Sequence, residues 1–299
     1  MAGFIAGCSQ RMQDLVAAAQ RVAPTNCPIV IVGERGSGRG TLAREIHGLS
    51  RRSTGLIAEA AASTLPVDDD LEAAVEALIV DASHGTLLLR GLEHLSHHAQ
   101  RALTDRRTAE GALASGAASG GGDARLILTS TLEIPRLVSS GCCSAYFFEI
   151  LSPVVLRTLP LRERTEDIPL LADEFLRREA ERIGIPLPVL SPGALVTLSS
   201  NRWIGNLTEL RETMVGLLHD APTAVIDAGA LGRVVIGESS QDGLSTLAER
   251  NRRFTLEVLE RTGGNKSRAA AVLGITRQTL YQRLRAYGLI DDYSRRARR

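Results

Sequence analysis

The order of apolar and polar positions predicts strands and helices that alternate along the first half of the chain. Apolar residues recur every three or four positions over residues 12–22, the spacing of one helix face. Residues 28–32 are instead a short run of mostly β-branched residues before Gly33, as in buried parallel strands. Further strands are predicted at 85–89, 125–129 and 152–156, and further helices at 42–49, 73–83 and 96–107. Strands that alternate with helices indicate a parallel α/β sheet.

The pattern becomes wholly helical from residue 168 onward. Helices are predicted at 168–183, 192–198 and 207–219, and again over 246–289 with a break at 263–264. Residues 108–123 are rich in Gly, Ala and Ser without periodicity, which predicts a flexible loop. The chain is therefore divided into an α/β core over 1–165, a helical segment over 166–228, a linker over 229–244 and an all-helical segment over 245–299.

Charge is unevenly distributed although the net charge of the 299 residues is only +1. Residues 245–299 hold 13 Lys and Arg against 5 Asp and Glu, so this segment is basic and the rest of the chain is acidic. A basic end on an acidic body indicates a polyanion-binding segment.

No apolar run reaches the ~20 residues that span a bilayer. No leader pattern stands at the N-terminus, so we expect a cytoplasmic protein without membrane contact. The four cysteines lack zinc-site spacing, so we expect reduced thiols and no metal site.

Residues 265–288 predict two short helices joined by a turn. Asn265 is a good N-cap, Gly274 supplies the turn, and Thr276 caps a second helix that runs to about Tyr287. The apolar positions that would form a small shared core are Ala270, Leu273, Ile275, Leu280 and Leu284. This arrangement is a helix-turn-helix, although its spacing alone leaves open a basic hairpin that binds protein.

Polar side chains of the second helix are suited to DNA. Residues near the start of a recognition helix reach base edges, and Arg and Gln can make bidentate contacts there. The predicted DNA-binding residues are Lys266, Ser267, Arg277, Gln278, Thr279, Tyr281, Gln282, Arg283 and Arg285. Among them Lys266, Arg283 and Arg285 are better placed for phosphates, which position a protein without reading sequence.

The same string closely resembles the Fis-type helix-turn-helix. Ten positions match that pattern: Asn265, Lys266, Ala269, Ala270, Leu273, Gly274, Ile275, Arg277, Thr279 and Leu280. The resemblance implies binding to double-stranded DNA. It also implies a homodimer formed through the preceding helix, where Phe254, Val258 and Leu259 share one face.

Residues 33–41 read GERGSGRGT, a degenerate phosphate loop. In a working loop glycine amides cradle phosphates, and a lysine after the last glycine reaches the terminal oxygens. Here Arg39 stands in the lysine position. The candidate nucleotide-binding residues are Gly33, Glu34, Gly36, Gly38, Arg39, Gly40 and Thr41. The pattern by itself leaves open a tight turn that binds nothing.

Three stretches, 33–47, 156–176 and 190–210, resemble the AAA+ domain of sigma-54-dependent transcription activators. The resemblance covers nearly the whole chain. It implies an AAA+-like three-layer α/β core with a parallel sheet, a small helical lid and an all-α C-terminal helix-turn-helix domain. It also leaves contact with RNA polymerase and a higher oligomer open.

Several catalytic and coupling positions depart from the family pattern. Arg90 and Gly91 follow the second predicted strand, where the family has the acids that hold Mg²⁺. By alignment, the γ-phosphate sensor, the two arginines supplied across the subunit interface and the lid arginine fall at Thr131, Cys143, Glu149 and Thr208. Residues 53–84 lack the Gly-Ala-Phe-Thr-Gly-Ala loop that contacts the sigma factor, and residues 58–62 are predicted to be an ordinary loop.

The helix-turn-helix predicts a DNA-binding transcription regulator. The departures at the catalytic positions predict that this regulator is not an enzyme. We expect no catalytic residue and no required cofactor, with ATP or ADP binding without hydrolysis left open. Two alternatives remain at this point: a working ATP-binding activator, and a subunit that joins the oligomers of an intact relative and modulates it.

Overall fold

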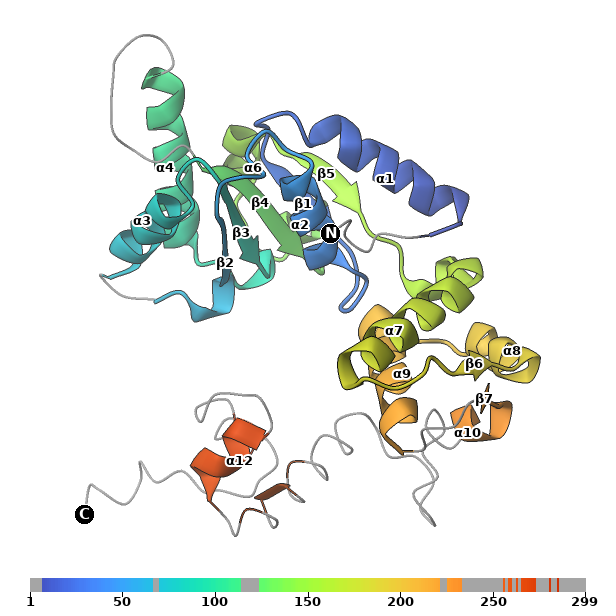
Figure 1. Ribbon diagram of the computed structural model, residues 1–299. Coiled ribbons are helices and arrows are strands. Elements are labelled where there is room, and N and C mark those ends of the chain that lie inside the picture. The colour runs from blue at the N-terminus through green and yellow to red at the C-terminus, as the bar shows by residue number, and fades with distance from the viewer. Residues whose placement is uncertain are drawn as a thin grey trace. The chain divides into compact units, whose positions relative to one another are not determined.

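The computed structural model describes two compact units of the chain, Met1–Val235 and Ile236–Arg299 (Figure 1). In the first unit the described residues are 7–66, 70–113, 124–220 and 225–232. In the second unit they are 255, 258, 259, 262, 265–272, 280 and 284.

Five parallel strands form the sheet of the first unit, in the order β2-β3-β4-β1-β5. The strands are β1 (Ile29–Val32), β2 (Ile57–Ala61), β3 (Thr86–Arg90), β4 (Arg125–Ser130) and β5 (Val154–Arg157). Ile29 of β1 pairs with Ile127 of β4 and with Val154 of β5. The four predicted strands are confirmed.

The prediction of a loop at residues 58–62 was wrong, because β2 occupies Ile57–Ala61. This strand lies at the edge of the sheet and pairs only with β3 among the described strands. It is half-buried and has Ile57 followed by three alanines and Glu59, so it lacks the continuous apolar run that marked the central strands. Pairing with β3 stabilises this strand, although most of its side chains have a weak preference for strands.

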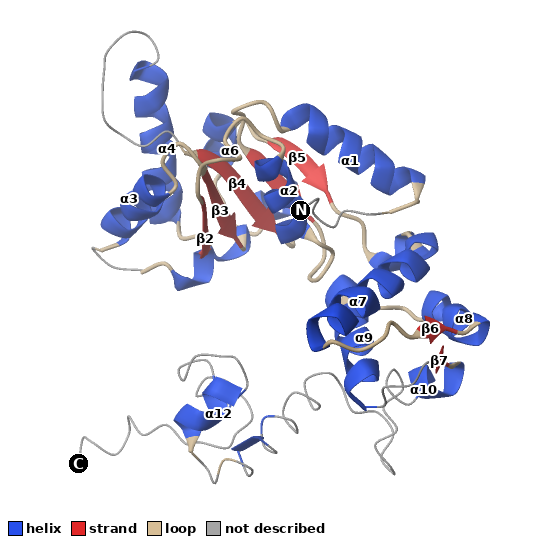
Figure 2. Ribbon diagram, in the orientation of Figure 1, coloured by secondary structure: helices blue, strands red, loops and turns tan. Residues whose placement is uncertain are grey.

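Helices cover both faces of the sheet, which makes three layers (Figure 2). Successive residues of a strand point to opposite faces. Ile29 and Ile31 pack with the helices of one face, and Val30 and Val32 pack with those of the other. The first face carries α1 (Gln10–Val22) and α2 (Arg39–Gly48). The second carries α3 (Leu71–Asp81), α4 (His97–Leu113), α5 (Ile134–Ser139) and α6 (Ala145–Leu151).

Helix α4 is longer than the sequence predicted. It continues through Leu113, so the first part of the stretch expected to be a loop, 108–113, is helical. These residues include Ala, Glu and Leu, which are good helix formers, and helix propensity outweighs the single Gly111. Residues 114–123 lie outside the described residues.

The lid begins after β5 with two short 3₁₀ turns, Leu161–Glu163 and Thr165–Asp167. Its helices are α7 (Ile168–Ile183), α8 (Pro192–Ser200), α9 (Asn206–Asp220) and α10 (Ala228–Gly232). Trp203 is buried at the centre and donates its indole N–H to the Leu198 carbonyl at 2.8 Å. The expectation of a wholly helical segment was wrong at β6 (Val189–Leu190) and β7 (Val225–Ile226), because two-residue strands leave no periodic signal.

In the second unit, α12 (Lys266–Val272) begins directly after Asn265. The Asn265 side-chain oxygen accepts the backbone N–H groups of Ser267 and Arg268, each at 3.1 Å, which confirms the predicted N-cap. A small core contains Val258, Ala269, Ala270, Leu280 and Leu284. Leu273 and Ile275, which were expected in it, lie outside the described residues. Across both units, no helix that the structure describes is long and apolar enough to cross a bilayer.

Candidate nucleotide-binding site

The loop at residues 33–38 connects the end of β1 to the start of α2. Gly36 and Gly38 have φ of 78° and 101°, in the left-handed region that side chains disfavour. Gly33 donates its N–H to the Ser130 carbonyl at 3.2 Å, and a methyl group on Gly33 would collide with the Thr158 hydroxyl. The glycines therefore shape a tight loop that lies against the ends of β4 and β5.

The first turn of α2 presents unpaired amide groups. Leu42 donates its backbone N–H to the Gly38 carbonyl at 2.9 Å, which is the first helical bond. Among the described residues, the backbone N–H groups of Gly38, Arg39, Gly40 and Thr41 have no acceptor. Such groups at a helix N-terminus, together with the helix dipole, favour an anion.

Arg39 extends from this turn into a half-buried position. Its Nη1 atom is buried and has no hydrogen-bond partner in the part of the chain that the structure describes. Burial lowers the pKa of Arg39, the Glu93 carboxylate opposes this effect, and the positive charge of Arg35 adds to it. A guanidinium nevertheless stays protonated in proteins. The unpaired donor costs about 1–3 kcal/mol, which a bound anion would recover.

Glu93 lies in the 3₁₀ turn after β3, close enough for its charge to act on Arg39. Its Oε1 atom accepts the Thr131 hydroxyl at 2.8 Å. Burial raises the pKa of Glu93, but hydrogen bonds from its own amide, Thr131 and Ser130 outweigh burial and leave the pKa below its usual value. Arg90 is exposed at the end of β3. No group of three metal-ligating side chains exists among the described residues. The residues after β3 thus offer Mg²⁺ one ionised carboxylate beside a cation.

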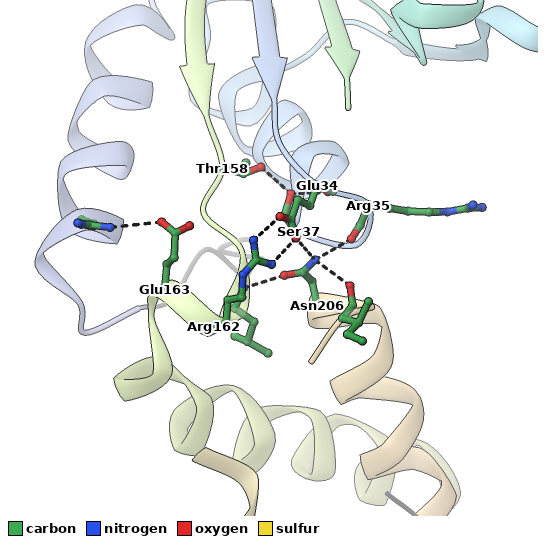
Figure 3. Close-up of polar contacts among 10 residues, drawn as sticks. Glu34, Arg35, Ser37, Thr158, Arg162, Glu163 and Asn206 are labelled. Atoms are coloured by element: carbon green, nitrogen blue, oxygen red, sulfur yellow. Dashed lines mark hydrogen bonds and ion pairs between the residues drawn. The ribbon is translucent and has the colours of Figure 1, made fainter. Parts of the chain in front are cut away.

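The lid contacts the other side of the loop (Figure 3). Arg162 donates two hydrogen bonds to the Glu34 carboxylate at 2.6 and 2.5 Å, and these lower the pKa of Glu34. Asn206 donates to the Arg35 carbonyl at 2.9 Å, and the Leu207 N–H donates to the Gly36 carbonyl at 3.0 Å. The lid therefore binds the loop carbonyls and leaves the amide groups at the start of α2 unpaired.

A small cavity adjoins the loop on its apolar side. It has a volume of about 20 Å³, room for about one water molecule. Its lining includes Met12, Leu15, Arg164 and Leu171. Arg164 is 3% exposed and donates to the Ser37 carbonyl at 3.1 Å. A cavity of this volume is too small to hold a purine base.

The three positions aligned with the family's arginines differ in how far they are buried in the structure. Cys143 is buried, donates its thiol to the Leu92 carbonyl, and has its pKa raised to about 12 by burial. Glu149 is exposed on α6, and Thr208 is exposed in the first turn of α9.

Two of the nine predicted DNA-binding residues are described. Lys266 and Ser267 open α12, where Ser267 is exposed and Lys266 is partly exposed. The other seven lie outside the described residues: Arg277, Gln278, Thr279, Tyr281, Gln282, Arg283 and Arg285. Their role in DNA contact stays a prediction.

Comparison with known families decides the ancestry. A family model described as the sigma-54 interaction domain matches residues 6–161. An AAA+ ATPase lid domain matches 162–247, and the Fis family of bacterial regulatory proteins matches 247–287. The transcriptional regulatory protein ZraR of Escherichia coli K12 is 32% identical over 93% of this chain and 67% of its own length.

The chain belongs to the family of sigma-54-dependent transcriptional regulators. With a Fis-family segment at its end, this family member is a DNA-binding regulator. The nitrogen assimilation regulatory protein NtrX of Azorhizobium caulinodans is 29% identical over 95% of the chain and 68% of the relative.

Solved structures agree with the α/β AAA+ fold. NtrX from Brucella abortus in complex with ATP superposes with a TM-score of 0.66 at 27% identity, over 96% of this chain and 69% of that one. The RuvB Holliday junction branch migration motor of Thermotoga maritima has a TM-score of 0.51 at 15% identity, which shows the fold alone. The parallel sheet, the lid and the helical C-terminus all fit this family.

Sequence reasoning assigned no role to the lid residues that hold the loop. Arg162 and Asn206 stand in stretches that carried the family resemblance, but neither was a candidate site residue. Their partner Glu34 is 128 and 172 positions away along the chain. The only signal in the sequence was general: arginine often forms two parallel hydrogen bonds to a carboxylate.

Proposed function

We propose that this family member regulates transcription by binding specific DNA, while its AAA+-like domain holds a nucleotide without hydrolysing it. One observation carries the proposal: the strand end that should hold Mg²⁺ presents Arg90 and Gly91. Unpaired amide groups and the Arg39 guanidinium still favour phosphate. NtrX of Brucella abortus has been solved with ATP and with ADP, which supports nucleotide binding in this chain.

Loss of hydrolysis follows from electrostatics. Phosphoryl transfer depends on charges positioned around the transition state, chiefly the metal and arginines. Here the metal position carries a cation, Cys143 is buried, and Glu149 has the wrong sign. We therefore expect the AAA+-like domain to act as a scaffold, sensor or partner-binding body and not as a motor.

A phosphate-release assay with and without DNA tests this proposal. We expect no turnover above background. Arg39→Lys should not restore activity, because Arg90 and Gly91 remain. Turnover near ~1 s⁻¹, the low end of typical enzymes, would refute the proposal.

Direct action on the sigma factor is also not expected. In residues 53–84, β2 and α3 take up most of the described chain where the family has its contacting loop. Purified sigma-54 and this protein should not form a stable complex with a transition-state nucleotide analogue. A complex isolated by gel filtration would contradict this expectation.

The DNA-binding part of the proposal rests on the capped helix and its small core. We expect residues 245–299 to dimerise and bind a roughly palindromic site whose half-sites lie one or two helical turns apart. Arg277→Ala should cost about 1–3 kcal/mol and relax specificity at one base position. Arg285→Ala should weaken all sequences about equally and lower the salt slope by about one. Equal losses on specific and random DNA for both variants would show that this helix does not read sequence.

A further inference from the structure

The residues at this site do not fit the Mg²⁺ ion that the family implies. This disagreement bears on whether the bound nucleotide carries a metal. We propose that the loop binds the polyphosphate of a free nucleotide, with arginine guanidinium groups in place of the metal. The inference rests on the proposed nucleotide binding and specifies that the nucleotide is metal-free.

Arg90 lies at the same end of the parallel sheet as the phosphate loop. Arg90 pairs with Thr129 of β4, and the next residue of β4, Ser130, pairs with Val32 at the end of β1. Neighbouring strands are ~4.8 Å apart, so Arg90 begins two strands away from the loop, within reach of a long side chain. Gly91 has φ of 81° and no side chain. Mg²⁺ requires oxygen ligands, and this strand end offers a cation and a glycine instead.

The phosphate side of the site holds an excess of donors. Four backbone N–H groups at the start of α2 and the buried Nη1 of Arg39 have no acceptor among the described residues. Arg35 lies close enough for its charge to lower the pKa of Arg39. These donors suit the full negative charge of a free nucleotide better than the reduced charge of its Mg²⁺ complex.

Glu93 is a carboxylate near this strand end that could bind a metal ion. It is ionised, it accepts the Thr131 hydroxyl, and its charge acts on Arg39. In a metal-free site Glu93 repels the phosphates and partly neutralises Arg39. In a metal site it would be a ligand, and its removal would have the opposite effect on affinity.

Titration calorimetry of the full-length protein with ADP distinguishes these cases. Affinity is measured in excess MgCl₂ and in excess EDTA at matched ionic strength. We expect ADP to bind at least as tightly in EDTA, and Glu93→Gln to tighten binding in both buffers. Arg39→Gln should weaken binding at least about tenfold in both buffers, because a charge-assisted hydrogen bond is lost.

Arg21→Ala is the matched control for charge. Arg21 is exposed in the last turn of α1, beside Val22, whose carbonyl accepts a hydrogen bond from Arg125 at the start of β4. Arg21 therefore lies near the amino ends of the strands, whereas the phosphate loop lies at their carboxyl ends, and its removal should leave ADP affinity unchanged.

Two results would overturn the inference. Binding more than about threefold tighter in MgCl₂ than in EDTA would assign a metal to the site. Loss of binding in Glu93→Gln would do the same. Both leave nucleotide binding itself intact. An absence of ADP binding in either buffer would refute the proposed nucleotide binding and this inference together.

Discussion

Asn206 is the residue whose removal should most clearly separate the lid from the phosphate loop. It is fully buried with φ of 55°, a left-handed conformation that Asn tolerates better than Ala. Its side-chain oxygen accepts the Leu161 N–H at 2.7 Å, and its amide donates to the Arg35 carbonyl at 2.9 Å. One side chain thus joins the loop, the lid and the segment after β5.

The cost of Asn206→Ala can be worked from these contacts. Leu161 is fully buried, so its N–H would lose its partner without access to water, at about 1–3 kcal/mol. The lost hydrogen bond to Arg35 adds about 1 kcal/mol, and the left-handed backbone about 1 kcal/mol more. The total of about 3–5 kcal/mol should lower Tm by about 6–20 °C for a unit of this size.

Thermal unfolding followed by circular dichroism measures this effect. Arg202→Ala is a suitable control, because the side chain of Arg202 is exposed only four residues before Asn206. Its removal should change Tm by less than about 2 °C. If Asn206→Ala unfolds within the same range as this control, Asn206 does not hold the lid and the loop together.

Three further predictions follow from burial, charge and backbone geometry. Hydrogen bonds from Arg182 lower the pKa of Glu179 from 4.5 to about 2, so this stabilisation is present above pH 4.5 and is lost as the pH falls towards 2. Glu179→Gln should therefore reduce the acid sensitivity of the urea midpoint, and an unchanged pH profile would contradict this. Gly36→Ala should destabilise the folded unit by at least about 1 kcal/mol in urea titrations, because of its positive φ and its contact with Gly205; wild-type stability would exclude that contact. In the native protein, iodoacetamide should alkylate the exposed Cys27 and not the buried Cys143, and mass spectrometry showing similar rates would place Cys143 at the surface.

Local pattern was sufficient for much of the fold. The buried run at β1, the glycines after it and the helical spacing of α1 and α7 each depend on residues close in sequence. The Asn265 cap is local in the same sense, since its acceptor and donors lie within three residues. Sequence alone also indicated the phosphate loop and the substitutions at Arg39, Arg90 and Gly91.

Only the tertiary structure decided the remaining features, because their partners are distant along the chain. Strand β2 depends on pairing with β3, and its own alanines carry no strand signal. The contacts of Asn206 with Arg35 and of Arg162 with Glu34 span more than a hundred residues. Periodicity reports which face of an element is buried, but it does not report which distant polar group that face meets. For this reason the loop was predictable, whereas its attachment to the lid and the unpaired guanidinium of Arg39 were not.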